Sequence, residues 1–121
     1  THTFTAKPKL VPLHKHFDLF ANSTYVLSCN LLSGSSPVHF EWLKDNQILT
    51  NSEHIRIESS SNSRASLLTF SHVGSSNAGR YECNAKNSEG VDSTSTEIAV
   101  QCASIDQICI TFFSIISLQL I

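Results

Sequence analysis

Two cysteines, one tryptophan and one tyrosine constrain the fold of this chain more than any other residues. Cys29, Trp42 and Cys83 each lie in a short run of alternating apolar and polar side chains, and Tyr81 lies two positions before Cys83. A period of two is the pattern of a β-strand that buries one face. We therefore expect three strands that turn these residues toward a shared core. Their use in packing removes most enzymatic interpretations.

The rest of the chain repeats this pattern. Turn residues recur at the spacing of about 8–12 residues that is typical of an all-β sandwich. Pro12 predicts that the first segment, residues 10–20, lies at a sheet edge, because proline cannot donate a ladder hydrogen bond. Leu68 is predicted to point inward, and no run predicts a helix of useful length. The predicted strands cover residues 25–31, 38–43, 47–49, 55–58, 68–70, 81–85 and 91–100.

Composition and motifs argue against several classes of function. The 121 residues suffice for one domain with a buried core, and a net charge of −2 gives no basic surface for nucleic acid. The sequence has no Gly-x-Ser-x-Gly elbow and no paired carboxylates in a predicted cleft, so we expect no enzyme and no cofactor. His14 and His16 share one face of an extended segment, but no third ligand can be named, and we expect no metal site.

Two motifs resemble those of a known domain family. These are WLKDN over residues 42–46 and YECNAKNSEG over residues 81–90, and together they are similar to an intermediate-set (I-set) immunoglobulin domain. The resemblance covers residues 8–101. Residues 1–7 are predicted to be a leader, and residues 102–121 a hydrophobic tail outside the folded domain.

The resemblance implies the fold in detail. It implies an all-β immunoglobulin-like sandwich of two antiparallel sheets with Greek-key topology. A Cys29–Cys83 disulfide is then expected between the sheets, with Trp42 against it and with Leu68 and Tyr81 in the core. The Tyr81 hydroxyl is expected to reach the backbone a few residues upstream, as in a tyrosine corner.

One position departs from the family pattern. The acidic residue of the usual D-x-G-x-Y-x-C motif is Asn77 in this chain. A buried ion pair with Arg56 is therefore not available. We expect the Asn77 side chain to accept a hydrogen bond from the Arg56 guanidinium instead, with less charge assistance and some loss of stability.

Within the set, residues 8–12 and 32–45 are similar to the extracellular domains of Dscam, the Down syndrome cell adhesion molecule, especially its arthropod forms. That resemblance implies homophilic cell–cell adhesion, with another copy of the same receptor as the partner. Contactins, hemicentins and titin-type muscle domains share much of the same motif frame. A matrix or muscle assembly module without self-recognition, and a soluble secreted immune protein, are therefore alternatives.

The compartment follows from the cysteines and from one sequon. The implied disulfide persists only in an oxidising environment, which predicts an extracellular or cell-surface protein. Asn22 begins the sequence Asn-Ser-Thr, a glycosylation acceptor that agrees with a secretory route. Residues 108–121 carry no charge, so a truncated membrane span, a lipid-anchor signal and a non-native extension all remain open for them. We assign no pairing to Cys102 and Cys109. We expect membrane association only through the parent protein or this tail.

The candidate interface lies in the first edge segment. His14, Lys15, His16, Phe17 and Asp18 combine charge with an aromatic ring on a strand that the scaffold leaves free. Such a mixture is typical of protein interfaces, and it is also compatible with an ordinary solvated edge.

Overall fold

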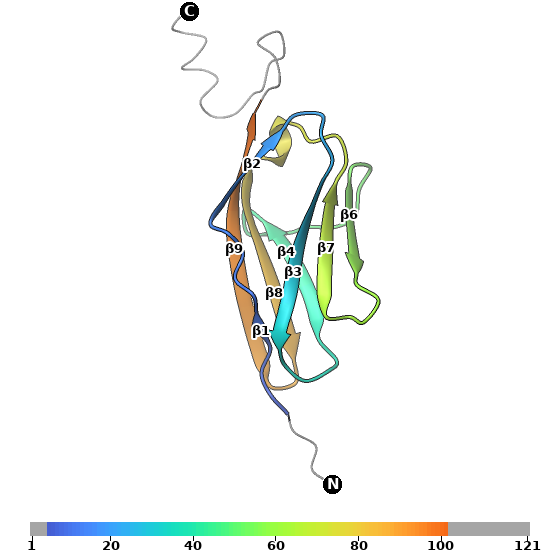
Figure 1. Ribbon diagram of the computed structural model, residues 1–121, viewed down its shortest axis with the longest axis vertical. Coiled ribbons are helices and arrows are strands. Elements are labelled where there is room, and N and C mark those ends of the chain that lie inside the picture. The colour runs from blue at the N-terminus through green and yellow to red at the C-terminus, as the bar shows by residue number, and fades with distance from the viewer. Residues whose placement is uncertain (1–4, 102–121) are drawn as a thin grey trace, which may run out of the picture.

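Two β-sheets packed face to face make up the part of the chain that the computed structural model describes, residues 5–101 (Figure 1). One sheet has the strand order β1-β3-β7-β6, and the other has the order β2-β9-β8-β4-β5. The strands are β1 Lys9–Leu10, β2 His16–Phe20, β3 Tyr25–Ser33, β4 His39–Lys44, β5 Gln47–Ile48, β6 Ile55–Ser59, β7 Ala65–Phe70, β8 Gly79–Asn87 and β9 Gly90–Gln101.

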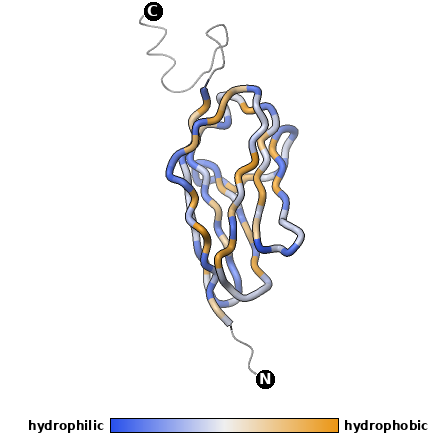
Figure 2. The backbone as a smooth tube through the Cα atoms, in the orientation of Figure 1, coloured by the Kyte–Doolittle hydropathy of each residue, from blue (hydrophilic) through white to orange (hydrophobic). Residues whose placement is uncertain are grey.

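Alternating burial along the strands confirms the predicted fold class. In β3, Leu27, Cys29 and Leu31 are buried while the residues between them are exposed or half-buried. Hydropathy alternates in the same way along the backbone (Figure 2), and the buried side chains of both sheets meet in one apolar cluster. The chain crosses between the sheets after β1, β2, β3, β5 and β7. The domain is an all-β sandwich.

The first segment contains two edge strands rather than one. β1 pairs with β3, whereas β2 pairs with β9 in parallel, with His16 opposite Glu97 and Phe20 opposite Gln101. This is the one parallel pair among the described strands; all the others are antiparallel. The chain changes sheets around Pro12, where the missing N–H interrupts the ladder.

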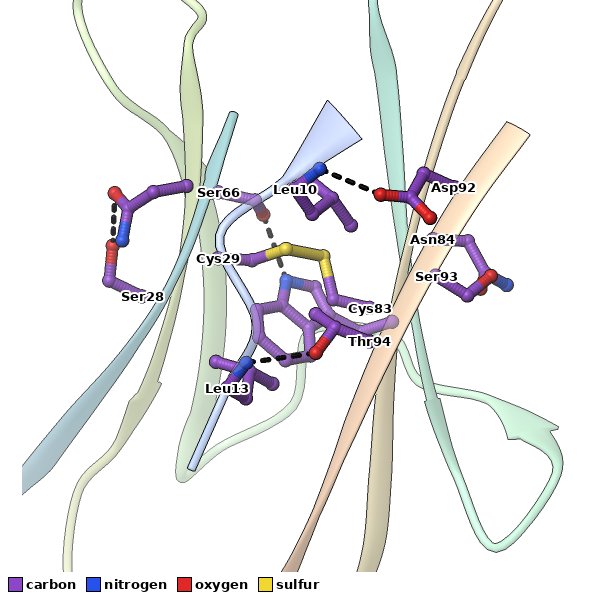
Figure 3. The surroundings of a disulfide bond; sticks show 12 residues. Leu10, Leu13, Ser28, Cys29, Ser66, Cys83, Asn84, Asp92, Ser93 and Thr94 are labelled. Carbon is purple, nitrogen blue, oxygen red and sulfur yellow. Dashed lines mark hydrogen bonds between the residues drawn. A yellow bond between two sulfur atoms is a disulfide. The ribbon is translucent and has the colours of Figure 1, made fainter. Parts of the chain in front are cut away.

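Side chains of β9 hold this crossing in place. Asp92 Oδ2 accepts a hydrogen bond from the backbone N–H of Leu10 at 2.7 Å, and Thr94 Oγ1 accepts one from that of Leu13 at 2.8 Å (Figure 3). The N–H groups that leave one sheet are therefore satisfied before the chain joins the other, as half-buried backbone groups require.

The prediction that the Asn77 side chain accepts a hydrogen bond from Arg56 is wrong. Arg56 lies on β6, 72% exposed at its side chain, with its guanidinium 3.6 Å from Glu58. Asn77 ends the short 3₁₀ helix η1 (Ser75–Asn77), and its side-chain oxygen accepts a hydrogen bond from the N–H of Gly74 at 2.8 Å. A short amide side chain bonds to a nearby backbone donor more readily than to a side chain on the distant strand β6.

Two sequence predictions concern residues outside this description. The structure describes nothing of the tail at 102–121 or of Cys102 and Cys109, and the predicted domain limits stay predictions. Within residues 5–101, no helix is long and apolar enough to cross a bilayer. The described chain enters at one end of the sandwich and leaves β9 at the opposite end (Figure 1).

Candidate functional site

The residues that define the fold are sealed inside the sandwich. Cys29 on β3 and Cys83 on β8 form a disulfide that joins the two sheets (Figure 3). Trp42 lies opposite Cys83 in the ladder, and its indole N–H donates to Ser66 Oγ at 2.8 Å. All four residues are buried. They stabilise the scaffold and have no surface with which to contact a partner.

Tyr81 extends this core toward η1. Its ring meets Phe70 edge to face, with the centroids 5.4 Å apart, and Leu68 is fully buried in the same cluster. The Tyr81 hydroxyl donates to the carbonyl of Asn77 at 2.7 Å, which confirms the expected tyrosine corner. Burial raises the pKa of Tyr81. The phenol therefore acts as a fixed hydrogen-bond donor at physiological pH.

Four of the five candidate interface residues are exposed, and the fifth is not. His14, Lys15, His16 and Asp18 are exposed, whereas Phe17 points inward from β2 and is half-buried. The Phe17 ring packs against the core and lies 5.9 Å from the Tyr25 ring between centroids. Strand alternation accounts for the division, because neighbouring residues of β2 face opposite sides.

His16 and Asp18 form a pair on the outer face of β2. His16 Nε2 lies 2.9 Å from Asp18 Oδ1, and the side chains are 55% and 54% exposed. The hydrogen bond from His16 holds the pKa of the Asp18 carboxyl below its usual range. Gln101 on β9 donates to the same oxygen at 3.4 Å. The pair is polar and open to solvent.

The edge of β2 has a free row of backbone groups. The N–H of Glu97 donates to the carbonyl of Lys15 at 3.0 Å, and the N–H of Ala21 donates to that of Gln101 at 2.8 Å. Odd-numbered residues of this segment therefore bond to β9, since backbone direction alternates in a parallel pair. The N–H and C=O groups of His16 and Asp18 point the other way, and no described strand pairs with that side of β2.

Sequence reasoning missed three residues of this surface. Phe20 lies on the same face of β2 as His16 and Asp18, and Glu97 and Gln101 join it from β9. The alternation of β2 could have identified Phe20. The other two depend on the parallel register with β9, for which the sequence carries no local signal. We call His14, Lys15, His16, Asp18, Phe20, Glu97 and Gln101 the β2-edge surface.

The Immunoglobulin I-set domain family matches residues 8–100, most of the chain. The chain belongs to this family. The match agrees with the paired sheets, the disulfide that joins them and the tyrosine corner.

Among curated relatives of this I-set domain, rat (Rattus norvegicus) contactin-3 is 29% identical over 86% of the chain. Human (Homo sapiens) junctional adhesion molecule A is 32% identical over 63%, and mouse (Mus musculus) membrane-bound pro-neuregulin-2 is 32% identical over 64%. The chain spans 9%, 27% and 10% of the lengths of these relatives. The similarity is therefore to one part of each protein.

Solved structures share the fold at lower identity. Titin domain M7 superposes with a TM-score of 0.73 at 20% identity, covering 83% of this chain and 99% of that one. The Dscam1 Ig7 domain, isoform 5, gives a TM-score of 0.71 at 23% identity, covering 78% and 97%. Likeness at this level shows the common I-set sandwich and does not separate an adhesion receptor from a muscle protein.

His14 and His16, the two histidines that share one face of the first segment, have separate contacts in the structure. The His14 ring lies edge-on to Phe17, with centroids 5.7 Å apart, while His16 contacts Asp18. Across the described residues, no group of three or more His, Cys, Asp or Glu side chains is placed to hold a metal ion.

The sequon lies in the tight turn between β2 and β3. Asn22 is exposed and has a left-handed φ of 68°, which asparagine tolerates better than most residues. Its position leaves the amide side chain accessible beside the far end of the β2-edge surface.

Proposed function

We propose that this I-set domain is an extracellular protein-recognition module of a cell-adhesion molecule. The Cys29–Cys83 disulfide carries the proposal, because such a buried bond is typical of oxidising compartments. Similarity to contactin-3 and to a junctional adhesion molecule supports the same class. The Asn22 sequon, accessible in its turn, agrees with a secretory route.

The proposed partner is another copy of the same receptor, as in the Dscam family that the chain resembles. The β2 edge suits self-pairing on geometric grounds. If two β2 strands met antiparallel about Phe17, His16 of each copy would lie opposite Asp18 of the other. The free backbone groups of these residues would then exchange hydrogen bonds, as in a hydrogen-bonded antiparallel pair.

This arrangement is isologous, since one patch serves both copies and closes the contact at a dimer. A His–Asp pair across strands contributes only about 0.2–1 kcal/mol. Weak single contacts suffice on opposed membranes, where many copies act together.

Bead aggregation tests self-recognition. Beads coated with the protein that carries this domain are expected to clump with their own kind and not with beads that carry a close isoform. A matrix or muscle role predicts no clumping. Homotypic clumping that fails at every coating density contradicts the proposal.

The thiols of Cys29 and Cys83 test the compartment separately. Protein from its natural source is unfolded in denaturant, because both cysteines are buried in the folded domain, and is alkylated without reductant. The labelled positions are then mapped on peptides. An extracellular module leaves both cysteines unlabelled, whereas a muscle protein in a reducing cytosol gains a label on each.

A further inference from the structure

Among the described Phe, Tyr and Trp residues, the one exposed side chain stands beside the sequon. Phe20 ends β2 with 59% of its surface exposed, and Asn22 and Thr24 follow within the same turn. Two residues of chain span at most about 7 Å. A sugar attached to Asn22 can therefore reach the Phe20 ring.

The turn that joins them is held on both sides. The backbone N–H of Ser23 donates to the carbonyl of Phe20 at 3.2 Å, and its hydroxyl donates to the same oxygen at 2.5 Å. The N–H of Asn22 donates to the carbonyl of Val73 at 2.7 Å, and the N–H of Val73 donates to that of Ser23 at 2.9 Å. Four hydrogen bonds thus set the point at which a modified Asn22 side chain leaves the domain.

We propose that Asn22 carries an N-linked glycan whose first N-acetylglucosamine packs on the ring of Phe20. The inference rests on the proposed extracellular location, because the modification requires the secretory route. The C–H groups on one face of the sugar carry partial positive charge, and the face of the phenyl ring is negative. The contact also removes exposed apolar surface from water. Little entropy is lost when it forms, since the turn is already ordered.

The glycan has a consequence for strand pairing. It covers the Phe20 end of the β2-edge surface and leaves His16 and Asp18 open. Pairing about Phe17 places only His14 of the second copy opposite Phe20, whereas a register shifted toward Phe20 brings the second β2 strand itself against the sugar. The glycan therefore disfavours shifted registers at an open sheet edge, where a second strand could otherwise pair in several registers.

A two-by-two comparison of melting temperatures tests the contact. The chain is secreted from animal cells and trimmed with an endoglycosidase that leaves one N-acetylglucosamine on Asn22. Thr24→Ala removes the sequon and keeps Asn22 in its turn. Both forms are made again with Phe20→Leu, which keeps an apolar side chain and removes the ring face. The effect of Thr24→Ala itself cancels between the two backgrounds.

The single sugar is expected to raise Tm by about 4 °C with Phe20 present, and by less than about 1 °C with Phe20→Leu. In Ile48→Ala, which truncates an exposed apolar residue on β5, the full shift should persist. The N-acetylglucosamine proton resonances should move upfield with Phe20 and return with Phe20→Leu. Equal Tm shifts in both Phe20 backgrounds overturn the contact.

The outcomes separate this inference from the proposed function. Intact mass spectrometry that finds Asn22 unmodified, on a protein whose beads still clump, overturns the glycan and leaves recognition standing. A glycan with the Phe20-dependent shift, on a protein whose beads do not clump, supports this inference and contradicts self-recognition.

Discussion

The disulfide core and the β2 edge differ in how far their residues are buried and in how their polar groups are satisfied. In the core, Trp42 and Tyr81 are buried and their polar atoms have partners at 2.8 and 2.7 Å. At the edge, His16 and Asp18 are half-exposed and their backbone groups face solvent. Substitutions in the core should therefore change stability, and substitutions at the edge should change association.

The first prediction is the largest loss of stability, at the centre of the core. Trp42→Ala removes the indole between the sheets and leaves Ser66 Oγ without its donor. We expect the free energy of unfolding to fall by about 3–5 kcal/mol, measured by urea denaturation. A loss below about 1 kcal/mol contradicts the burial of Trp42 between the two sheets.

The second prediction isolates one core hydrogen bond. Tyr81→Phe keeps the ring against Phe70 but leaves the carbonyl of Asn77 without the phenol. The expected cost is about 1–2 kcal/mol by the same measurement. Tyr25→Phe is the control, because Tyr25 is only half-buried, and it should change stability by less than about 0.5 kcal/mol.

The third prediction is a gain. Thr96 is buried, and its hydroxyl has no hydrogen-bond partner in the described part of the chain. Thr96→Val replaces the hydroxyl with a methyl group of similar size on a strand, where valine is favoured. We expect a stabilisation of about 1 kcal/mol. A destabilised variant would mean that a water or a bound group satisfies the hydroxyl.

The fourth prediction concerns pH at the edge and has the smallest effect. Because the folded pKa of Asp18 is lowered, its contribution is present above the pKa of the unfolded chain and disappears as pH falls through the folded value. The carboxyl is exposed, so the change in stability should be slight. NMR titration should show the Asp18 pKa rise in His16→Ala, and an unchanged pKa would remove His16 as the cause.

How far the sequence predicts the structure also differs between the two regions. The core followed from alternation around Cys29, Trp42 and Cys83, because burial on one strand face is a local pattern. The position of Phe17 beneath the edge obeys the same rule, and a strict alternation count would have placed it there.

The edge depends on non-local features. The parallel register that brings Glu97 and Gln101 beside β2 joins segments about 80 residues apart in the chain. The bond from the Gly74 N–H to Asn77 Oδ1 replaced the expected one with Arg56, because a backbone donor three residues away competes well against a side chain on a distant strand. Family resemblance supplied the wrong partner here, since it assumed a geometry built for an acidic residue.

Complementary charge reversal on β2 tests the central claim most directly. Beads that carry Asp18→Lys and beads that carry His16→Glu should each lose homotypic clumping at least about tenfold. Asp18→Lys removes the carboxylate that faces His16 of the other copy, and His16→Glu places two carboxylates opposite each other across the paired strands. Mixed together, the two kinds should clump with each other. Glu58→Lys, on the edge strand β6 beside Arg56, should clump as the parent does, and all variants should unfold within about 0.5 kcal/mol of it. Unchanged homotypic clumping in both β2 variants, or no rescue on mixing, contradicts recognition through the β2 edge.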